Sequence, residues 1–395
     1  MSKGCETDQV EPGGSGCGPL DWFGNMVGNS LDHVRAERER GSPIVGILCE
    51  FTPRELIMAA GGVPVLLCGG SAETIPSAEE VLPTNLCPLI KSTYGYNMEG
   101  TNPFLEMSDL LVAETTCDGK KKMYELLSED HDMHVLELPQ KVDDQDAMTH
   151  WVAELHKLKQ RLETRIGRAI SEEDMREGIR RMNEERRLRR ELAALMKADE
   201  PPMTGRELLD LKSIVSGIPA DIEQYQRALE VLPGRKIEPS GAKRVRVLLT
   251  GVPLPHGAER VLDIIENAGG LVVCQESCTG VKPILDDVDA DAADPLLAIA
   301  EKYFHLPCSV MTSNRSRMDS LRILAKEYRA DCVIDLIWMA CITYDVESHF
   351  VRRLVEEDLE LPYLRIETDY SPSDSASLTM RVQALLETAS SRAGS

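Results

Sequence analysis

The chain has 395 residues, which is long enough for two or three domains with large buried cores. Hydrophobic residues make up 42% and charged residues 28%, a balance typical of a soluble globular protein. The formal net charge of −22 repels phosphate groups and acidic lipid headgroups, so nucleic acids and membrane surfaces are excluded as expected partners.

The expected location of the protein follows from two features that the sequence lacks. No apolar run approaches the roughly 18–20 residues that a membrane-spanning helix needs. The first residues, MSKGCETDQVEPGGSGCG, contain no apolar segment of a secretory signal. We therefore expect a cytoplasmic protein, and we predict that residues 1–18, rich in Gly and polar residues, form a flexible tail.

Residues 19–147 are predicted to form an N-terminal α/β domain. A helical pattern covers about 20–40, and apolar runs at 43–48, 63–68, 109–113 and 134–138 predict strands with helices between them. After the first strand, Thr52 is predicted to cap a helix, with Pro53 at its first position and Glu55 in its first turn. Short apolar runs that alternate with helices favour a parallel sheet.

The next part of the chain changes character and then returns to the first pattern. Residues 148–240 are long, charged, amphipathic stretches, with Ser171 as a predicted N-cap, and are predicted to form a helical connector. Strands are predicted at 244–251, 271–277, 332–338 and 361–367, with a helix from Asp345. The predicted fold is therefore α/β, with two Rossmann-like (flavodoxin-like) parallel-sheet domains, at 19–147 and 241–395, joined by the connector.

The placement of the eleven cysteines is the most informative feature of the sequence. Four of them sit at the predicted carboxyl end of a strand, where open α/β sheets bind ligands, namely Cys49, Cys117, Cys278 and Cys341. Two more lie in loops beside prolines, Cys87 and Cys308. A thiolate binds soft iron, and the N–H groups at a helix N-terminus favour a thiolate or an anionic cluster. The pattern therefore predicts cysteine ligands in a cleft between the two domains.

The remaining cysteines have simpler interpretations. Cys68, Cys274 and Cys332 lie inside strand patterns, where a free cysteine commonly fills core space. Cys5 and Cys17 lie in the tail and are expected to be solvated thiols without a ligand role. No CxxC run is present, so a compact ferredoxin or zinc-ribbon site is excluded.

Several motifs resemble those of a known family, the 2-hydroxyacyl-CoA dehydratases and benzoyl-CoA reductases. The resemblance covers most of residues 20–390, and TPREL after one cysteine and DGKK after another are its more specific features. The motifs are CEFTPRELIMAAGGVP, LPTNLCPLIKS, TTCDGKKKMYE, SEEDMREGIRRMNEER, ESCTG and LPYLRIETD. WMACITYD, around Cys341, is a looser match to the family's last cysteine motif.

The resemblance implies an iron–sulfur cofactor. Dehydratase subunits of the family hold one [4Fe–4S] cluster with about three cysteines, between two Rossmann-like domains. A branch of the family, the double-cubane cluster proteins, holds an [8Fe–9S] cluster with three thiolates per cubane. The resemblance to this branch implies six ligands here, without assigning them to one cubane or the other: Cys49, Cys87, Cys117, Cys278, Cys308 and Cys341.

The resemblance also implies a reaction and partners. A separate iron–sulfur ATPase would deliver low-potential electrons, and the cluster would pass them to a small molecule such as acetylene, with two copies of the chain forming a homodimer. Residues near the proposed cleft that could supply protons are Glu50, His256, Glu276 and His305. The run Lys120-Lys121-Lys122 lacks the spacing of a phosphate-binding loop and is interpreted as a solvated surface, so no nucleotide site is expected on this chain.

Three alternatives to this function remain open. The chain could be a [4Fe–4S] subunit of a 2-hydroxyacyl-CoA dehydratase, which would need a different partner subunit. It could be a non-catalytic electron-transfer or cluster-storage protein. It could also be a metal-free α/β protein in which the cysteines only fill the core.

Overall fold

The computed structural model describes residues 18–237 and 244–393. Cys5 and Cys17, together with nearly all of the predicted tail, lie outside the described residues. None of the helices in the described part combines the length and apolar character that crossing a membrane requires.

Two four-stranded sheets form the framework, and every strand pair in both is parallel. The first sheet has the order β2-β1-β3-β4, and the second has the equivalent order β6-β5-β7-β8. This confirms the predicted α/β fold with two Rossmann-like domains. The strands are β1 (Ile44–Ile47), β2 (Val63–Leu66), β3 (Leu110–Glu114), β4 (Met133–Leu136), β5 (Val245–Gly251), β6 (Gly270–Glu276), β7 (Cys332–Trp338) and β8 (Tyr363–Thr368).

Most strands are largely apolar and buried because helices cover both faces of each sheet. All positions of β1, β3, β5, β6 and β7 are buried. The helices before the connector are α1 (Pro19–Gly24), α2 (Met26–Glu39), α3 (Arg54–Ala59), α4 (Ile75–Ala78), α5 (Pro88–Glu99), α6 (Pro103–Met107) and α7 (Asp118–Leu127). Those of the connector are α8 (Gln145–Ile166), α9 (Glu172–Ala194), α10 (Gly205–Asp210) and α11 (Pro219–Val231).

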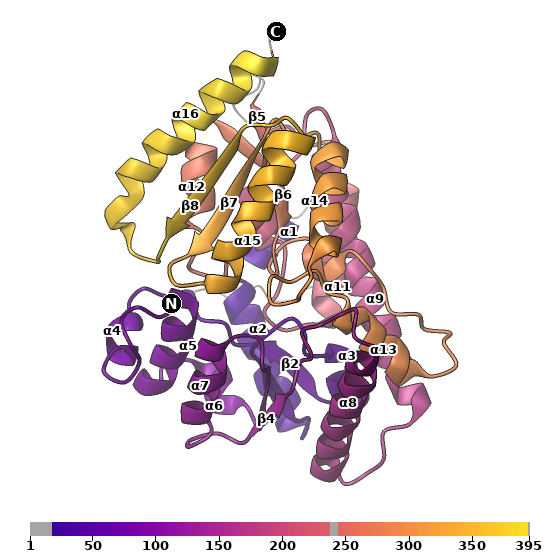
Figure 1. Cartoon of the computed structure of the whole chain (residues 1–395). Helices are drawn as coiled ribbons and strands as arrows, with labels where there is room; N and C mark the ends of the chain where they lie inside the picture. The colour runs from indigo at the N-terminus through magenta and orange to yellow at the C-terminus, as the bar shows by residue number, and fades with distance from the viewer. Residues whose placement is uncertain (1–17, 238–243, 394–395) are drawn as a thin grey trace.

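The helices of the second domain are α12 (Arg260–Asn267), α13 (Pro295–Phe304), α14 (Arg315–Glu327), α15 (Ile342–Arg353) and α16 (Ser375–Ala393). Short segments of 3-10 or π helix are η1 (Leu195–Lys197), η2 (Lys282–Ile284), η3 (Leu354–Asp358) and η4 (Pro372–Asp374). In Figure 1 the first domain, indigo to purple, lies below the second, orange to yellow, and α9 runs beside both.

One predicted helix start is wrong, and one is confirmed. Thr52 does not cap α3, whose N-cap is Pro53, because the buried Thr52 hydroxyl donates instead to the carboxylate of Glu114 on β3. Ser171 does cap α9: its hydroxyl accepts the Asp174 N–H at 3.1 Å, and the Asp174 carboxylate accepts the Ser171 N–H at 2.9 Å.

The two domains are joined by packing as well as by the chain. Helix α13 comes from the second half of the sequence, yet its Ile299 and Phe304 belong to the same buried core as β1, β3 and α8. The Tyr303 hydroxyl donates to Glu55 on α3 at 2.8 Å, and Arg186 on α9 pairs with the same carboxylate. This arrangement carries the loop after α13, including Cys308, to the carboxyl end of the first sheet.

One buried carboxyl group on the second sheet, that of Asp335, is expected to make the stability of the fold depend on pH. Asp335 on β7 is 1% exposed, and burial raises its pKa to about 7, against the opposing effects of Arg317 and of the Tyr363 hydroxyl, which donates to it at 3.0 Å. The folded protein therefore holds a proton on Asp335 between about pH 4 and pH 7, where the unfolded chain has lost it. The contribution of Asp335 to the free energy of unfolding is therefore largest below about pH 4, and it falls as the pH rises towards 7.

Asp335→Asn should remove this pH dependence. The unfolding free energy of the variant, relative to the wild type, should rise by about 2–3 kcal/mol between about pH 5 and pH 8. Urea unfolding at several pH values measures it, with Asp319→Asn on the exposed face of α14 as the control. If the difference in unfolding free energy between Asp335→Asn and the wild type stayed constant with pH, Asp335 would be ionised in the folded protein, against this prediction.

Candidate functional site

Three of the six predicted ligand cysteines occupy the same structural position, the N-cap of a helix. Cys87 precedes α5, Cys117 precedes α7 and Cys341 precedes α15. Backbone N–H groups of the following turn lie near each sulfur and act to lower its pKa: those of Leu89 and Ile90 on Cys87, those of Gly119 and Lys120 on Cys117, and that of Tyr344 on Cys341. Ser, Thr, Asp and Asn are the usual N-caps, so cysteine at three such positions indicates a role for the sulfur.

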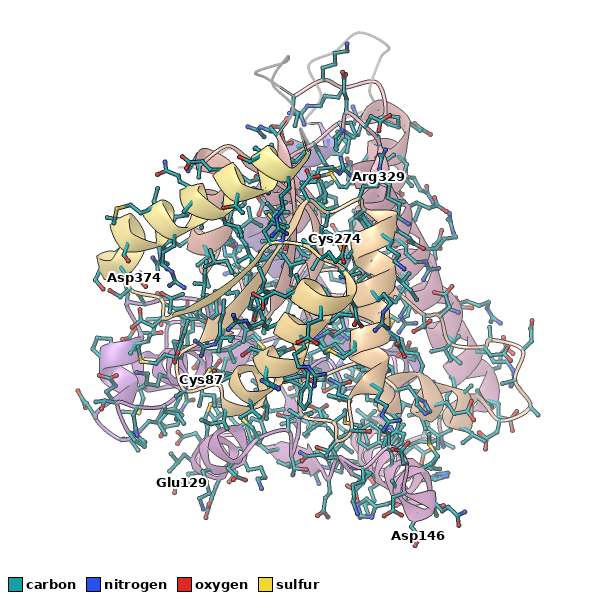
Figure 2. The ribbon with its side chains drawn as sticks, turned by 45° about the horizontal axis from the view of Figure 1, so that its top comes forward. Cys87, Glu129, Asp146, Cys274, Arg329 and Asp374 are labelled. Carbon is teal, nitrogen blue, oxygen red and sulfur yellow. The ribbon has the colours of Figure 1, made fainter. Side chains whose placement is uncertain are left out.

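These three cysteines converge from both domains and are called here the first triad: Cys87, Cys117 and Cys341. The Cys87 and Cys341 thiols lie close enough to interact, and this interaction lowers the pKa of Cys87 and raises that of Cys341. Cys117 interacts electrostatically with both of the others. Figure 2 shows Cys87 where the two domains meet.

The other three predicted ligands form the second triad: Cys49, Cys278 and Cys308. Cys49 follows β1, Cys278 follows β6, and Cys308 lies in the loop after α13. Cys278 and Cys308 are close enough to Cys49 to raise its pKa, and Cys308 is close enough to Cys278 to raise the pKa of that thiol. Burial raises the pKa of Cys278 to about 12 and that of Cys49 well above its ordinary value, so both thiols hold their protons in the absence of a metal.

The two triads are neighbours, because two side chains touch the surroundings of both. The Lys120 Nζ donates to the Leu48 carbonyl at 2.7 Å and interacts electrostatically with Cys49 and Cys117, one from each triad. The Tyr344 backbone lies near Cys341 and acts on its pKa, and the Tyr344 hydroxyl interacts electrostatically with Cys278 and Cys308. The six cysteines thus form one sulfur-rich region between the domains.

Two lysines place positive charge in this region. Lys120 lies between the triads, and Lys282 lies beside Cys278 and Cys308 and donates to the Tyr344 hydroxyl at 3.0 Å. Burial lowers the pKa of both, but neighbouring acidic groups outweigh it: Tyr124 and the thiols for Lys120, Glu276 and the thiols for Lys282. Lys282 also pairs with the Glu276 carboxylate at 3.1 Å, and positive charge on the two lysines would balance thiolates or an anionic cluster.

Sequence reasoning missed these two lysines. The sequence predicts that the Lys120–Lys122 run is solvated, and this holds for Lys121 and Lys122, whose side chains are 46% and 74% exposed. It is wrong for Lys120, because the helical period turns only that residue inwards to the Leu48 carbonyl. The apolar residues that flank Lys282 in VKPIL could have indicated its burial.

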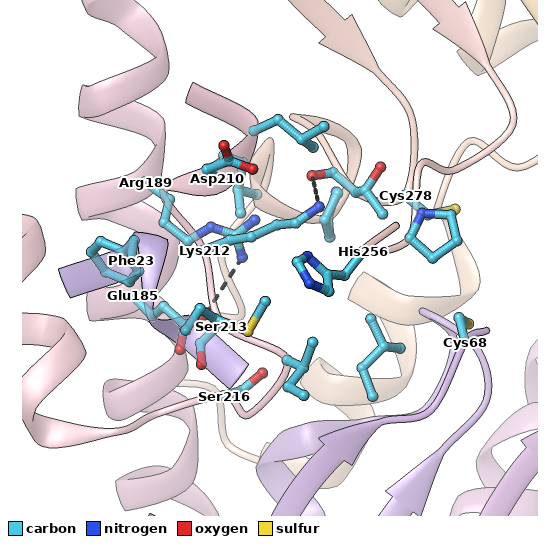
Figure 3. A pocket seen from close by; sticks show the side chains of 18 of the residues that line it. Phe23, Cys68, Glu185, Arg189, Asp210, Lys212, Ser213, Ser216, His256 and Cys278 are labelled. Atoms are coloured by element: carbon cyan, nitrogen blue, oxygen red, sulfur yellow. Dashed lines mark hydrogen bonds and ion pairs between the residues drawn. The ribbon is translucent and has the colours of Figure 1, made fainter. Parts of the chain in front are cut away.

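A cavity of about 310 Å³ opens next to the second triad. Cys278, Glu50 and His256 are part of its lining, together with the connector residues around Lys212 (Figure 3). Glu50 forms a two-point ion pair with Arg54, with distances of 2.9 and 3.0 Å. Cys68, expected to be core filler, also lines this cavity.

Two of the four predicted proton donors lie elsewhere. Glu276 is fully buried and pairs with Lys282 and Arg317, both at 3.1 Å. It lies in the protein interior and is not part of the cavity lining. His305 is exposed at the end of α13, where its Nδ1 contacts the Glu301 carbonyl at 2.7 Å, and it is not part of the cavity lining. Cys274 and Cys332 are fully buried in apolar clusters, as expected of core residues.

The donor set of the triads suits a cluster better than a single ion. Within residues 18–237 and 244–393, no three His, Cys, Asp or Glu side chains are arranged to ligate one metal ion. In an iron–sulfur cluster each thiolate binds a different iron, which requires cysteines that are grouped but separate. Three thiols per group, helix N-termini beside three of the sulfurs, and two nearby lysines fit such a cofactor.

Comparison with known proteins gives the same family. Residues 49–389 match the family described as 2-hydroxyglutaryl-CoA dehydratase, D-component. The chain is 41% identical over 360 residues to YjiM of Escherichia coli (strain K12), a protein named for a proposed role as a dehydratase subunit, covering 89% of this chain and 92% of the relative. It is 22% identical over 376 residues to the (R)-phenyllactyl-CoA dehydratase beta subunit of Clostridium sporogenes, covering 93% and 97%.

A reductase is among the relatives as well. One of the subunits of benzoyl-CoA reductase from Thauera aromatica is 20% identical over 311 residues, covering 77% of this chain and 79% of the relative. The chain therefore belongs to the 2-hydroxyglutaryl-CoA dehydratase D-component family, and its relatives include subunits of both an acyl-CoA dehydratase and benzoyl-CoA reductase.

Proposed function

We propose that this chain is an iron–sulfur reductase in which the two triads hold an [8Fe–9S] double-cubane cluster. The observation that carries the proposal is the division of the six cysteines into two neighbouring groups of three, each drawn from both domains. A single [4Fe–4S] cluster would use one group and leave the other without a purpose. The resemblance to the double-cubane branch predicted six ligands, and the grouping supports three for each cubane.

The bound cluster would supply low-potential electrons for the reduction of a small molecule. The chain's own residues would hold and surround it. Lys120 and Lys282 would offset its negative charge, and the N–H groups of α5, α7 and α15 would donate to its sulfur atoms. Because hydrogen bonds and nearby positive charge favour the reduced state, they would raise the potential from the value of an isolated cluster.

The cavity beside Cys278 is the proposed place for the substrate. Glu50 and His256 line it and are the candidates for holding or moving a proton there. We further propose that electrons come from a separate ATP-hydrolysing iron–sulfur protein, and that two copies of the chain form a homodimer. The relatives named as subunits of larger enzymes support the need for partner proteins.

A dehydratase subunit is the competing function, favoured by the names of two relatives. One assay separates the two. The anaerobically purified protein, supplied with ATP and an ATP-driven reductase, should reduce acetylene to ethylene and should need no second subunit. An absence of reduction, together with dehydration of a 2-hydroxyacyl-CoA once a second subunit is added, would replace the reductase proposal by the dehydratase function.

A further inference from the structure

The cavity beside the second triad carries an excess of positive charge in a strongly acidic protein. Its four carboxylates, Glu50, Glu185, Asp210 and Glu259, all have cationic partners. The ion pairs are Glu50 with Arg54 at 2.9 Å, Glu185 with Arg189 at 3.5 Å, and Asp210 and Glu259 with Arg206 at 2.9 and 3.9 Å. Each lining carboxylate thus has a cationic neighbour, although Asp210 and Glu259 share Arg206, which also pairs with Asp263 at 3.1 Å.

Two lysines on the same lining have no such compensation. The Lys212 Nζ donates to the Thr279 carbonyl at 3.5 Å, and the Lys302 Nζ donates to the Pro283 carbonyl at 3.1 Å and lies 4.9 Å from the centre of the Tyr303 ring. Among the described residues, neither ammonium group forms an ion pair with a carboxylate. An ammonium group has three N–H donors, so each lysine that lines this cavity keeps donor capacity that its carbonyl contact does not use.

The two lysines come from different parts of the chain and face one volume. Lys212 belongs to the connector, after α10, and Lys302 belongs to α13. Figure 3 shows Lys212 reaching across the cavity towards the side on which His256 and Cys278 lie. The carbonyl that Lys212 contacts belongs to Thr279, the residue after Cys278, so this ammonium group lies next to the second triad.

We propose that this cavity binds a small anion, such as a carboxylate or an inorganic oxyanion, between Lys212 and Lys302. The inference rests on the proposed function in one respect: it makes an anionic group part of the substrate or product of the reaction at the second triad. A volume of about 310 Å³ admits a small molecule with such a group. The net charge of −22 repels anions elsewhere, so this local excess of positive charge would select the binding place.

The electrostatics of the cavity agree with this assignment. Burial lowers the pKa of Lys212 and of Lys302 to about 7, and Arg189 and Arg186 respectively lower them further. Lys212 also faces Glu259, Asp210 and Glu50, and Lys302 also faces Glu55, Glu50 and Arg54. A bound anion would favour the charged form of both lysines, so binding should take up protons and should weaken as the pH rises above about 7.

Titration calorimetry on the anaerobically purified full chain tests the proposal. The probes are sodium acetate, inorganic phosphate and acetamide, which is a neutral molecule with nearly the shape of acetate. We expect saturable binding of acetate or phosphate at about one per chain, and no binding of acetamide. Lys212→Met and Lys302→Met should each weaken anion binding by about tenfold or more, because each removes a charged donor. Lys326→Met, at an exposed position of α14, is the matched control and should leave binding unchanged.

The outcomes separate this inference from the proposed function. Thermal unfolding of each lysine variant, and the iron content of the same samples, are measured alongside. Anion binding that is lost in the two cavity variants but kept in the Lys326 variant supports the inference, whatever the iron content. A failure of both anions to bind, or equal binding by all variants, overturns it, even in a sample that contains the full cluster. Equal binding of acetamide and acetate would also overturn it, since the site would then not select charge.

Discussion

Replacing Cys278 by alanine is expected to remove at least half of the bound iron. Cys278 is a member of the second triad, and a cubane that loses one of its three thiolates has an open iron site. We expect about four irons per chain or fewer in Cys278→Ala, compared with about eight in the wild type. Cys117→Ala, in the first triad, should give a similar loss. Iron and acid-labile sulfide are quantified after purification without oxygen.

The matched control for these variants is Cys332→Ala. Cys332 is fully buried on β7, where its side chain packs in the apolar core. Its replacement should cost some stability through the cavity that it leaves, but it should not change the iron content. If Cys278→Ala kept as much iron as Cys332→Ala, the assignment of Cys278 as a ligand would be wrong.

Replacing Arg317 by methionine is expected to destabilise the fold by about 3–5 kcal/mol, because it leaves buried carboxylates without their partner. Arg317 on α14 is fully buried and pairs with Glu276 at 3.1 Å and with Glu347. Its guanidinium group also lies 4.9 Å from the centre of the Tyr344 ring. The same change should disturb the second triad, because Glu276 also pairs with Lys282.

Arg322→Met on the same helix provides the control. Arg322 is 37% exposed and pairs with Asp319 and Asp358 at 2.7 and 2.8 Å. Exposed ion pairs contribute little, so this variant should lose about 1 kcal/mol or less. Urea unfolding of the two variants under identical anaerobic conditions measures the difference. Equal losses would mean that the buried charges around Arg317 do not depend on it.

The fold could be predicted from the sequence because its central strands are mostly apolar runs. The run CVIDLIW forms β7 with the predicted bounds, since a central parallel strand buries both faces and needs such a run. Helix ends were harder to predict. Helix α15 begins at Ile342, three residues before the predicted start at Asp345, because Cys341 is its N-cap. Cysteine is not among the usual capping residues, so no ordinary capping signal marks this helix start.

The candidate site was predictable only in part. The strand-end rule located Cys49, Cys117 and Cys278, because parallel strands present their carboxyl ends at one edge. The grouping of the cysteines was not predictable, since it depends on how the domains pack. Helix α13 crosses to the first sheet and takes Cys308 with it, a tertiary contact that no local pattern records.

The basic side chains around the site were missed for a related reason. A lysine in a charged stretch is ordinarily a surface residue, and the sequence of the connector around Lys212 predicts an amphipathic helix with its charged residues in solvent. Only the packing of α9 and α13 against the loop after β6 encloses it next to Cys278. The burial of the Lys212 ammonium group depends on how the domains pack together, so no local sequence pattern predicts it.

The central claim is that two triads of cysteines hold one double-cubane cluster, and its most direct test is the metal content of the protein purified without oxygen. The account predicts about eight irons and about nine acid-labile sulfides per chain. About four irons would contradict the double cubane and leave a single cluster, as in a dehydratase subunit. A protein without iron, never exposed to air, would contradict any role of the triads as cluster ligands.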